Sequence, residues 1–267
     1  MAAPSSYAMR ACMAVLGLFS TGTLAQEQDV DLELVLAVDA SRSMDLTEQQ
    51  LQKDGYVAAI QHPEVLAAIK AGLLGRIAVT YVEWAGPESQ VIVAPWAIVE
   101  DGPSAAAFAG RISAAEIALV RRTSISGALS FASDLFGGNG FNGMRQVIDV
   151  SGDGPNNSGF PVLQARQAVL DRGITINGLP IMINLDVFSG YSIRELDVYY
   201  EDCVIGGPGA FLVTVDNIDR IAEAIRRKLV LEIAGAPAIV MPAQFAERQP
   251  RIDCLIGEKL RRRWTDP

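Results

Sequence analysis

Three oxygen-bearing side chains stand at alternate positions where an apolar run ends. Asp39, Ser41 and Ser43 lie in the segment VLAVDASRSM, directly after the run 32–38. A carboxylate and two hydroxyls offer oxygen ligands only, the kind that hard divalent cations such as Mg²⁺ prefer. Taken alone, the two serines fit a second role better, because serine often caps the N-terminus of the next helix.

Two other segments supply further oxygens. Asp153 follows the apolar run 146–151, and Thr123 precedes a strong helical pattern. In an open parallel sheet, ligands collect at the carboxyl ends of strands where the strand order reverses. With the order 3-2-1-4-5-6, the first and fourth strands deliver both aspartates to that crevice. We therefore predict a site for Mg²⁺, with Mn²⁺ or Ca²⁺ as substitutes, formed by Asp39, Ser41, Ser43, Thr123 and Asp153.

The spacing of apolar residues indicates the elements that position this site. Short apolar runs rich in β-branched residues alternate with helical patterns, which is typical of a parallel sheet covered on both faces. Only AGPES separates the second and third runs, so we expect a hairpin and an antiparallel edge strand there. The predicted strands are residues 32–38, 76–84, 90–96, 146–151, 174–177 and 211–215.

Apolar residues at helical spacing predict helices over 125–136 and 218–229. Between them, Pro161 suits a first turn and Gly173 a helix stop, which predicts a helix over 161–171. Together with the strands they predict an α/β fold of three layers. It is doubly wound and Rossmann-like, with a mainly parallel six-stranded sheet and one antiparallel edge strand.

The two ends of the chain differ from its middle. Residues 1–25 combine Arg10, a short apolar run and a small-residue cleavage pattern, which predicts a signal peptide and a periplasmic or secreted protein. We assign residues 26–234 to the domain and 235–267 to a C-terminal extension. The net charge of −9 argues against nucleic-acid binding. No other stretch approaches transmembrane length, so we expect no membrane-spanning segment in the mature chain.

Removing the signal peptide also removes Cys12 and leaves Cys203 and Cys254. In an oxidising compartment this pair favours a disulfide, and the alternative is two separate buried thiols. The extension also carries a basic run, Lys259 and 261–263, which we interpret as a solvated tail rather than a contact with anionic lipid or a partner.

The order of these motifs resembles a known family. DxSxS after the first strand, Thr123 in a TSISGAL turn and a later Asp-Gly are similar to the metal-ion-dependent adhesion site of von Willebrand factor A-type domains. The resemblance covers about residues 30–234 and suggests an exported bacterial member. It implies that Ser41, Ser43 and Thr123 ligate the ion, and that Asp39 and Asp153 bind it directly or through water.

The resemblance also implies a partner, a protein that contributes an acidic residue to the ion. Many relatives have Gly between the two serines and a Gly-rich turn before the Thr. This chain instead has Arg42, Arg121 and Arg122, which either attract an acidic ligand or are solvated rim charges, and the sequence favours the second interpretation.

Enzymatic alternatives have less support. His62 is the single histidine and precedes a proline, in a predicted break between helices, so a Ser-His-Asp triad would need it to reach a distant serine. A Mg²⁺-dependent phosphoryl-transfer hydrolase could use Asp39 as nucleophile, but haloacid-dehalogenase-like enzymes have a second acidic residue where this chain has Ser41. A third alternative is a structural domain with a vestigial metal site. We expect a binding protein and no enzyme.

Overall fold

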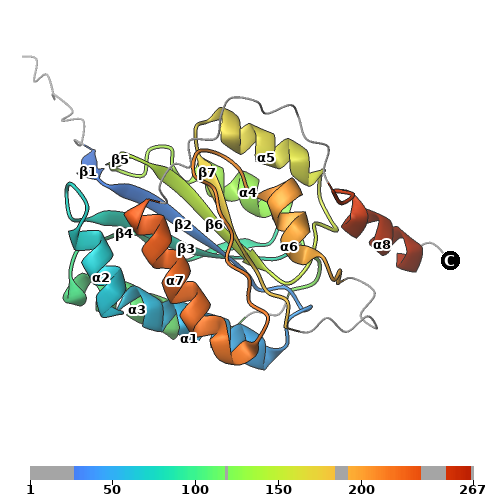
Figure 1. Cartoon of the computed structure of the whole chain (residues 1–267), viewed down its shortest axis with the longest axis horizontal. Coiled ribbons are helices and arrows are strands. Elements are labelled where there is room, and N and C mark those ends of the chain that lie inside the picture. Colours follow the sequence, from blue (N-terminus) through green and yellow to red (C-terminus); the bar gives the residue numbers. More distant parts are fainter. Residues whose placement is uncertain (1–26, 118–119, 184–191, 236–250, 266–267) are drawn as a thin grey trace, which may run out of the picture.

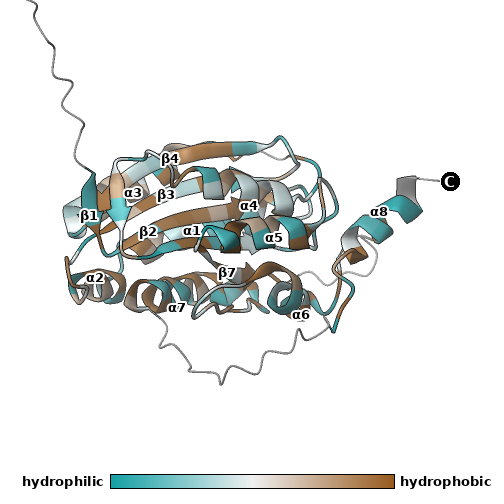
Figure 2. Cartoon of the chain, turned by 90° about the horizontal axis from the view of Figure 1, so that it is seen from above, coloured by the Kyte–Doolittle hydropathy of each residue, from teal (hydrophilic) through white to brown (hydrophobic). Residues whose placement is uncertain are grey.

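The computed structural model describes residues 27–117, 120–183, 192–235 and 251–265. These residues form a central sheet with helices on both faces (Figures 1 and 2). The predicted signal peptide, residues 1–25, lies outside the described residues.

The main sheet has five strands in the order β4-β3-β2-β6-β7. Only the β3–β4 pair is antiparallel among the strand pairs of this sheet, so β4 is the antiparallel edge strand that the short AGPES connection predicts. The three-layer, doubly wound fold class is therefore confirmed. The strands are β2 (Leu32–Asp39), β3 (Ile77–Trp84), β4 (Gln90–Val99), β6 (Gln146–Gly152) and β7 (Thr175–Pro180).

The predicted sixth strand, residues 211–215, is wrong as a regular strand. Leu212 and Val215 make only isolated parallel bridges, to Gly178 of β7 and to Ile181 just after it. Pro180 at the end of β7 has no N–H to donate, so the hydrogen-bond ladder cannot continue without a break. A short second sheet, which the sequence did not predict, pairs β1 (Gln28–Val30) with β5 (Phe141–Gly143).

Side chains of β2 alternate between two hydrophobic cores, because successive residues of a strand point to opposite faces. Leu34 and Leu36 enter the first core, whereas Val35 and Ala37 enter the second. The first core is covered by α1 (Leu46–Ile60), α2 (Pro63–Lys70), α3 (Gly102–Ala114) and α7 (Ile221–Ala234). The second is covered by α4 (Ile125–Asp134), α5 (Val162–Asp171) and α6 (Leu196–Tyr199).

The predicted helices are present with shifted ends. The third of them starts as a 3₁₀ turn, Ile218–Arg220, capped by Asn217, and continues as α7. A π-helical turn, Tyr200–Val204, follows α6 and packs into the second core.

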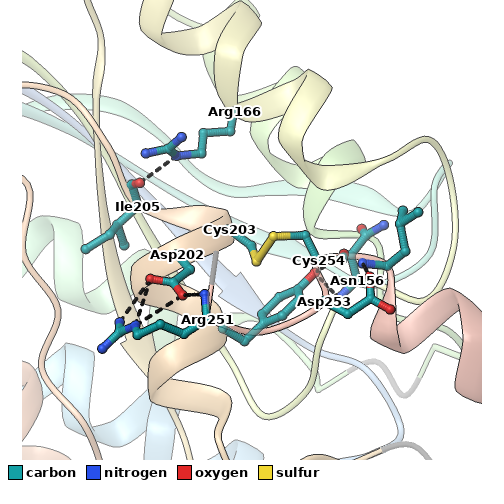
Figure 3. Close-up of a disulfide and its surroundings, with 10 residues drawn as sticks. Asn156, Arg166, Asp202, Cys203, Ile205, Arg251, Asp253 and Cys254 are labelled. Carbon is teal, nitrogen blue, oxygen red and sulfur yellow. Dashed lines mark hydrogen bonds and ion pairs between the residues drawn. A yellow bond between two sulfur atoms is a disulfide. The ribbon is translucent and has the colours of Figure 1, made fainter. Parts of the chain in front are cut away.

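The C-terminal segment attaches to this π-helical turn. Cys203 and Cys254 form the disulfide that the sequence favoured (Figure 3). Beside it, the Arg251 guanidinium forms an ion pair with Asp202 (Figure 3). Arg251 also forms an ion pair with Glu201. After the disulfide the chain forms α8 (Ile256–Thr265), which projects from the body at the end of the sheet opposite β1 (Figure 1).

None of the described helices is both long enough and apolar enough to cross a lipid bilayer.

Candidate metal centre

The carboxyl ends of β2 and β6 bring together the two aspartates of the predicted site. β2 ends at Asp39 and pairs in parallel with β6, which ends at Gly152. Ser41 Oγ lies 2.6 Å from Ser43 Oγ, and Ser43 donates a 2.6 Å hydrogen bond to Asp153 Oδ1. The Ser41 N–H donates to Asp39 Oδ1 at 2.7 Å. Hydrogen bonds therefore link the loop after β2 to the loop after β6.

Helix capping does not occupy the two serines. The N-cap of α1 is Asp45, which accepts a hydrogen bond from the Glu48 N–H, while the Glu48 carboxylate accepts one from the Asp45 N–H. This reciprocal arrangement is a capping box. Because Asp45 satisfies the start of α1, Ser41 and Ser43 have their hydroxyls at the candidate site instead.

Thr123 reaches the same region from a third loop. The Ser41 region forms a parallel bridge with Val120, where the Arg42 N–H donates to the Val120 carbonyl at 2.9 Å. The next helix, α4, is capped by Ser124, whose hydroxyl accepts from the Gly127 N–H at 3.1 Å. The buried Thr123 is therefore not required as the cap.

Asn157 is a positioning residue that the sequence analysis missed. Its side-chain oxygen accepts a hydrogen bond from the Thr123 N–H at 3.0 Å, and its own N–H donates to the Thr123 carbonyl at 2.9 Å. The neighbouring Asn156 accepts from the Ser126 N–H at 3.0 Å. Both asparagines are buried, so they join the loop after β6 to the start of α4. The only sequence signal was two adjacent asparagines soon after the Asp-Gly turn.

The electrostatics of the aspartates are unfavourable without a cation. Burial, and then the charge of Asp153, raise the pKa of Asp39 well above its ordinary value, although hydrogen bonds from Ser41 oppose the shift. Burial also raises the pKa of Asp153 to about 6, assisted by the charge of Glu48 and opposed by the Ser43 hydrogen bond. Both shifts have causes that a bound divalent cation would counteract, since an opposite charge favours ionised carboxylates.

One atom of the site has no partner in the described part of the chain. Asp39 Oδ2 is buried and accepts no hydrogen bond there. Such an orphaned carboxylate oxygen costs free energy unless it meets a donor or a cation. A Cβ added at Gly152 would lie 2.9 Å from the Tyr200 hydroxyl and 3.0 Å from this oxygen, so only glycine fits this close approach. The residues present therefore fit a divalent ion.

The described residues contain no group of three or more His, Cys, Asp or Glu side chains that could hold a metal. The candidate set is of a different kind, since it combines two carboxylates with three hydroxyls. Mg²⁺ accepts such oxygen ligands and normally retains water in its shell.

A cleft of about 520 Å³ opens beside the three hydroxyls of this set, whereas neither Asp39 nor Asp153 is among its lining residues. Its lining includes Ser41, Ser43 and Thr123, which places the three predicted hydroxyl ligands along one cavity.

Two further residues that could take part in chemistry, His62 and Asp149, have structural roles. His62 caps α2, where its Nδ1 accepts a hydrogen bond from the Glu64 N–H at 3.2 Å. Asp149 on β6 is buried and forms a 2.5 Å ion pair with Lys228 of α7.

Solved structures with a similar fold include several von Willebrand factor A-type domains. Proximal thread matrix protein 1 from the mussel byssus matches with a TM-score of 0.55 and 15% identity, over 79% of this chain and 49% of that one. A second structure of that protein, with a zinc-occupied metal-ion-dependent adhesion site (MIDAS), has a TM-score of 0.53 and 15% identity, with the same coverage of 79% and 49%. A von Willebrand factor type A protein from Catenulispora acidiphila has a TM-score of 0.53 and 15% identity, over 76% and 43%.

These similarities establish the fold, and this chain spans about half or less of each of those proteins. No curated protein matched the sequence. A family model described as "Protein of unknown function (DUF1194)" matches residues 29–237, well over half of the 267 residues. The chain therefore belongs to this family, and its domain has the von Willebrand factor A-type fold.

Proposed function

We propose that this chain is an extracytoplasmic binding protein that holds Mg²⁺ and, through the ion, engages an acidic residue of a protein partner. The proposed ligands are Asp39, Ser41, Ser43, Thr123 and Asp153. The observation that carries the proposal is the buried Asp39 Oδ2, which has no hydrogen-bond partner among the described residues. Asp39 is the last residue of β2, and in the loop that follows it Ser41 hydrogen-bonds Ser43, which in turn hydrogen-bonds Asp153.

The charge of the site supports an anionic ligand. Two aspartates only neutralise a divalent ion, and the hydroxyls add no charge, so the ion remains able to attract a further carboxylate. In this role Asp39 and Asp153 supply charge, and the serine and threonine hydroxyls orient around the ion. The bound cation supplies the attraction for the partner's carboxylate.

Two comparisons are consistent with this role. The mussel protein of the same fold has been solved with zinc in its MIDAS motif. A pilus adhesin, SpaC from Lactobacillus rhamnosus GG, also shares the fold, with a TM-score of 0.56 and 13% identity over 78% of this chain and 31% of that one. Export through a signal peptide, residues 1–25, and a domain of residues 26–234 with an extension at 235–267 belong to the same proposal.

Calorimetric titration of Mg²⁺ into the mature protein tests the site. We expect a binding heat in the wild-type protein that is lost in Asp39→Asn and Ser41→Ala. Matched controls on exposed helix positions, Asp54→Ala and Ser130→Ala, should bind as the wild type does. Equal heats in the site variants and the controls would refute the metal site.

A second assay separates binding from catalysis. Under the proposal, a generic phosphate monoester such as p-nitrophenyl phosphate is not hydrolysed in the presence of Mg²⁺. Turnover that disappears in Asp39→Asn would favour the phosphoryl-transfer alternative and overturn the proposal.

A further inference from the structure

The cleft beside the candidate metal centre is lined by four arginines. Arg42, Arg121 and Arg122 come from the loops that carry Ser41 and Thr123, and Arg261 comes from α8. The first three are exposed, and Arg261 is half-buried. The whole chain has a net charge of −9, so this concentration of positive charge is local. A cleft lined by one sign of charge attracts ligands of the opposite sign.

Three of these arginines have no carboxylate partner in the described part of the chain. Salt bridges there involve other cations, such as Arg172 with Asp134, but not Arg42, Arg121 or Arg122. Their guanidinium groups are available to a ligand, and each can donate two parallel hydrogen bonds to a carboxylate.

The C-terminal segment forms one wall of this cleft. Arg261 donates hydrogen bonds to the Asn157 carbonyl at 3.2 Å and to Ser158 Oγ at 3.1 Å. One turn earlier in α8, the Glu258 carboxylate accepts from the Asn156 side chain at 2.7 Å. These contacts attach α8 to the loop that follows β6, the loop that also carries Asp153. The basic run is therefore more than a solvated tail, because Arg261 takes part in the cleft.

The disulfide fixes the start of this wall. Cys254 lies two residues before α8 and is bonded to Cys203 in the second core. Residues 251–265 lie beyond the family match, which ends at residue 237. The wall is therefore a feature of this chain that the family match does not describe.

We infer that the cleft binds an acidic segment of the protein partner, one that carries several carboxylates. One carboxylate reaches the metal ion, and its neighbours pair with the three arginines of the two loops, while the charge of Arg261 on α8 adds to the attraction. This inference rests on the proposed metal-mediated binding and specifies its ligand. A single carboxylate cannot satisfy an ion and three arginines, whereas a peptide with several acidic residues can. The cleft volume of about 520 Å³ lies within the range of ordinary ligand pockets, roughly 300–1,000 Å³.

Two synthetic peptides test this inference on the mature protein in the presence of Mg²⁺. Both are Gly/Ser nonapeptides with a fluorescent label; one carries a single Asp and the other carries Asp at four alternate positions. Exposed ion pairs contribute little each, so we expect a preference of about tenfold for the four-Asp peptide, equivalent to about 1.4 kcal/mol. The preference should decrease with added salt, because exposed charges are screened.

Charge-removing variants locate the effect. In Arg121→Gln/Arg122→Gln the preference should fall to about threefold or less, and in Arg261→Gln it should fall by about threefold. Arg227→Gln is the matched control, since Arg227 is exposed on α7 and does not line the cleft. It should keep the wild-type preference. Thermal unfolding of each variant checks that it is folded.

Several outcomes would overturn the inference. Equal affinities for the two peptides in wild-type protein would do so, while Mg²⁺-dependent binding of the single-Asp peptide would leave the proposed function standing. If the Arg121→Gln/Arg122→Gln variant kept the wild-type preference for the four-Asp peptide, these two arginines would not contribute to peptide binding. If Arg261→Gln kept it, α8 would not contribute. Stronger competition by an oligogalacturonate than by the four-Asp peptide would assign the cleft to an acidic polysaccharide. If a chelator left the affinity for both peptides unchanged, the metal contact would be refuted, and with it the proposed function.

Discussion

Replacing Lys228 by methionine tests how the first core tolerates charge. The side chains of Lys228, Asp149 and Glu232 are at most 1% exposed. Lys228 Nζ lies 2.5 Å from Asp149 Oδ1 and also bonds to Glu232. Methionine fills a similar volume but leaves both carboxylates without this cation. Breaking a buried ion pair in this way costs about 3–5 kcal/mol of unfolding free energy, and we expect that loss at pH 8.

The loss should depend on pH in a defined direction. Burial, and then the charge of Asp149, raise the pKa of Glu232 to about 7 from an ordinary 4.5, while Lys228 opposes the shift. Burial likewise raises the pKa of Asp149, again opposed by Lys228. Without Lys228 both values rise further, so the folded variant holds more protons than folded wild-type protein. Stability falls with rising pH wherever the folded state holds the extra protons.

The variant should therefore recover stability on acidification. Each additional proton bound by the folded variant changes the difference in unfolding free energy between variant and wild type by about 1.4 kcal/mol per pH unit. This difference is measured by urea unfolding of the non-reduced protein at pH 8 and pH 5, with tryptophan fluorescence as the probe. Arg227→Met, one residue earlier and exposed, is the control and should change stability by less than about 0.5 kcal/mol. A loss for Lys228→Met below about 1 kcal/mol at pH 8, or an equal loss at both pH values, would refute the reasoning.

Three further changes have expected outcomes. Replacing Cys203 and Cys254 by serine should cost about 4 kcal/mol in urea unfolding, from the chain entropy of a loop spanning 51 residues, and a change under 1 kcal/mol would contradict this. Gly152→Ala places a Cβ 3.0 Å from Asp39 Oδ2, so the Mg²⁺ affinity measured by calorimetry should fall at least about tenfold. An affinity equal to that of the wild-type protein would show that this oxygen does not bind the ion. Phe108→Ala should cost about 3–5 kcal/mol, because Phe108 is buried in the first core, and a small loss would mean that the core collapses around the gap.

The strands and the meeting of the site loops could be predicted because they follow from local patterns. Apolar runs mark the strands of the main sheet, and parallel strands end at one edge, so Asp39 and Asp153 had to lie near each other. The disulfide was favoured by the even number of cysteines in the mature chain. Thr123 could be predicted at the site because it comes just before a helix with a strong apolar periodicity.

Other features depend on contacts that no local pattern encodes. Residues 211–215 have strand-like composition, but their partner β7 ends in Pro180, and the break in the ladder comes from that partner. The double hydrogen bond between Asn157 and Thr123 joins residues 34 apart, and either asparagine could have been an ordinary loop residue. The docking of Arg261 against Asn157 and Ser158 likewise requires the folded position of α8, which its charge alone did not reveal.

Because Asp45 caps α1 and Ser124 caps α4, the residues that start the helices around the site differ from the predicted hydroxyl ligands. The predicted ligands Ser41, Ser43 and Thr123 do not hold either helix start. Substitutions that remove the hydroxyls of the two serines should therefore leave the starts of both helices intact. A homologue that lost these hydroxyls would still have both helix caps, so family members must be sorted by what they bind rather than by whether they fold.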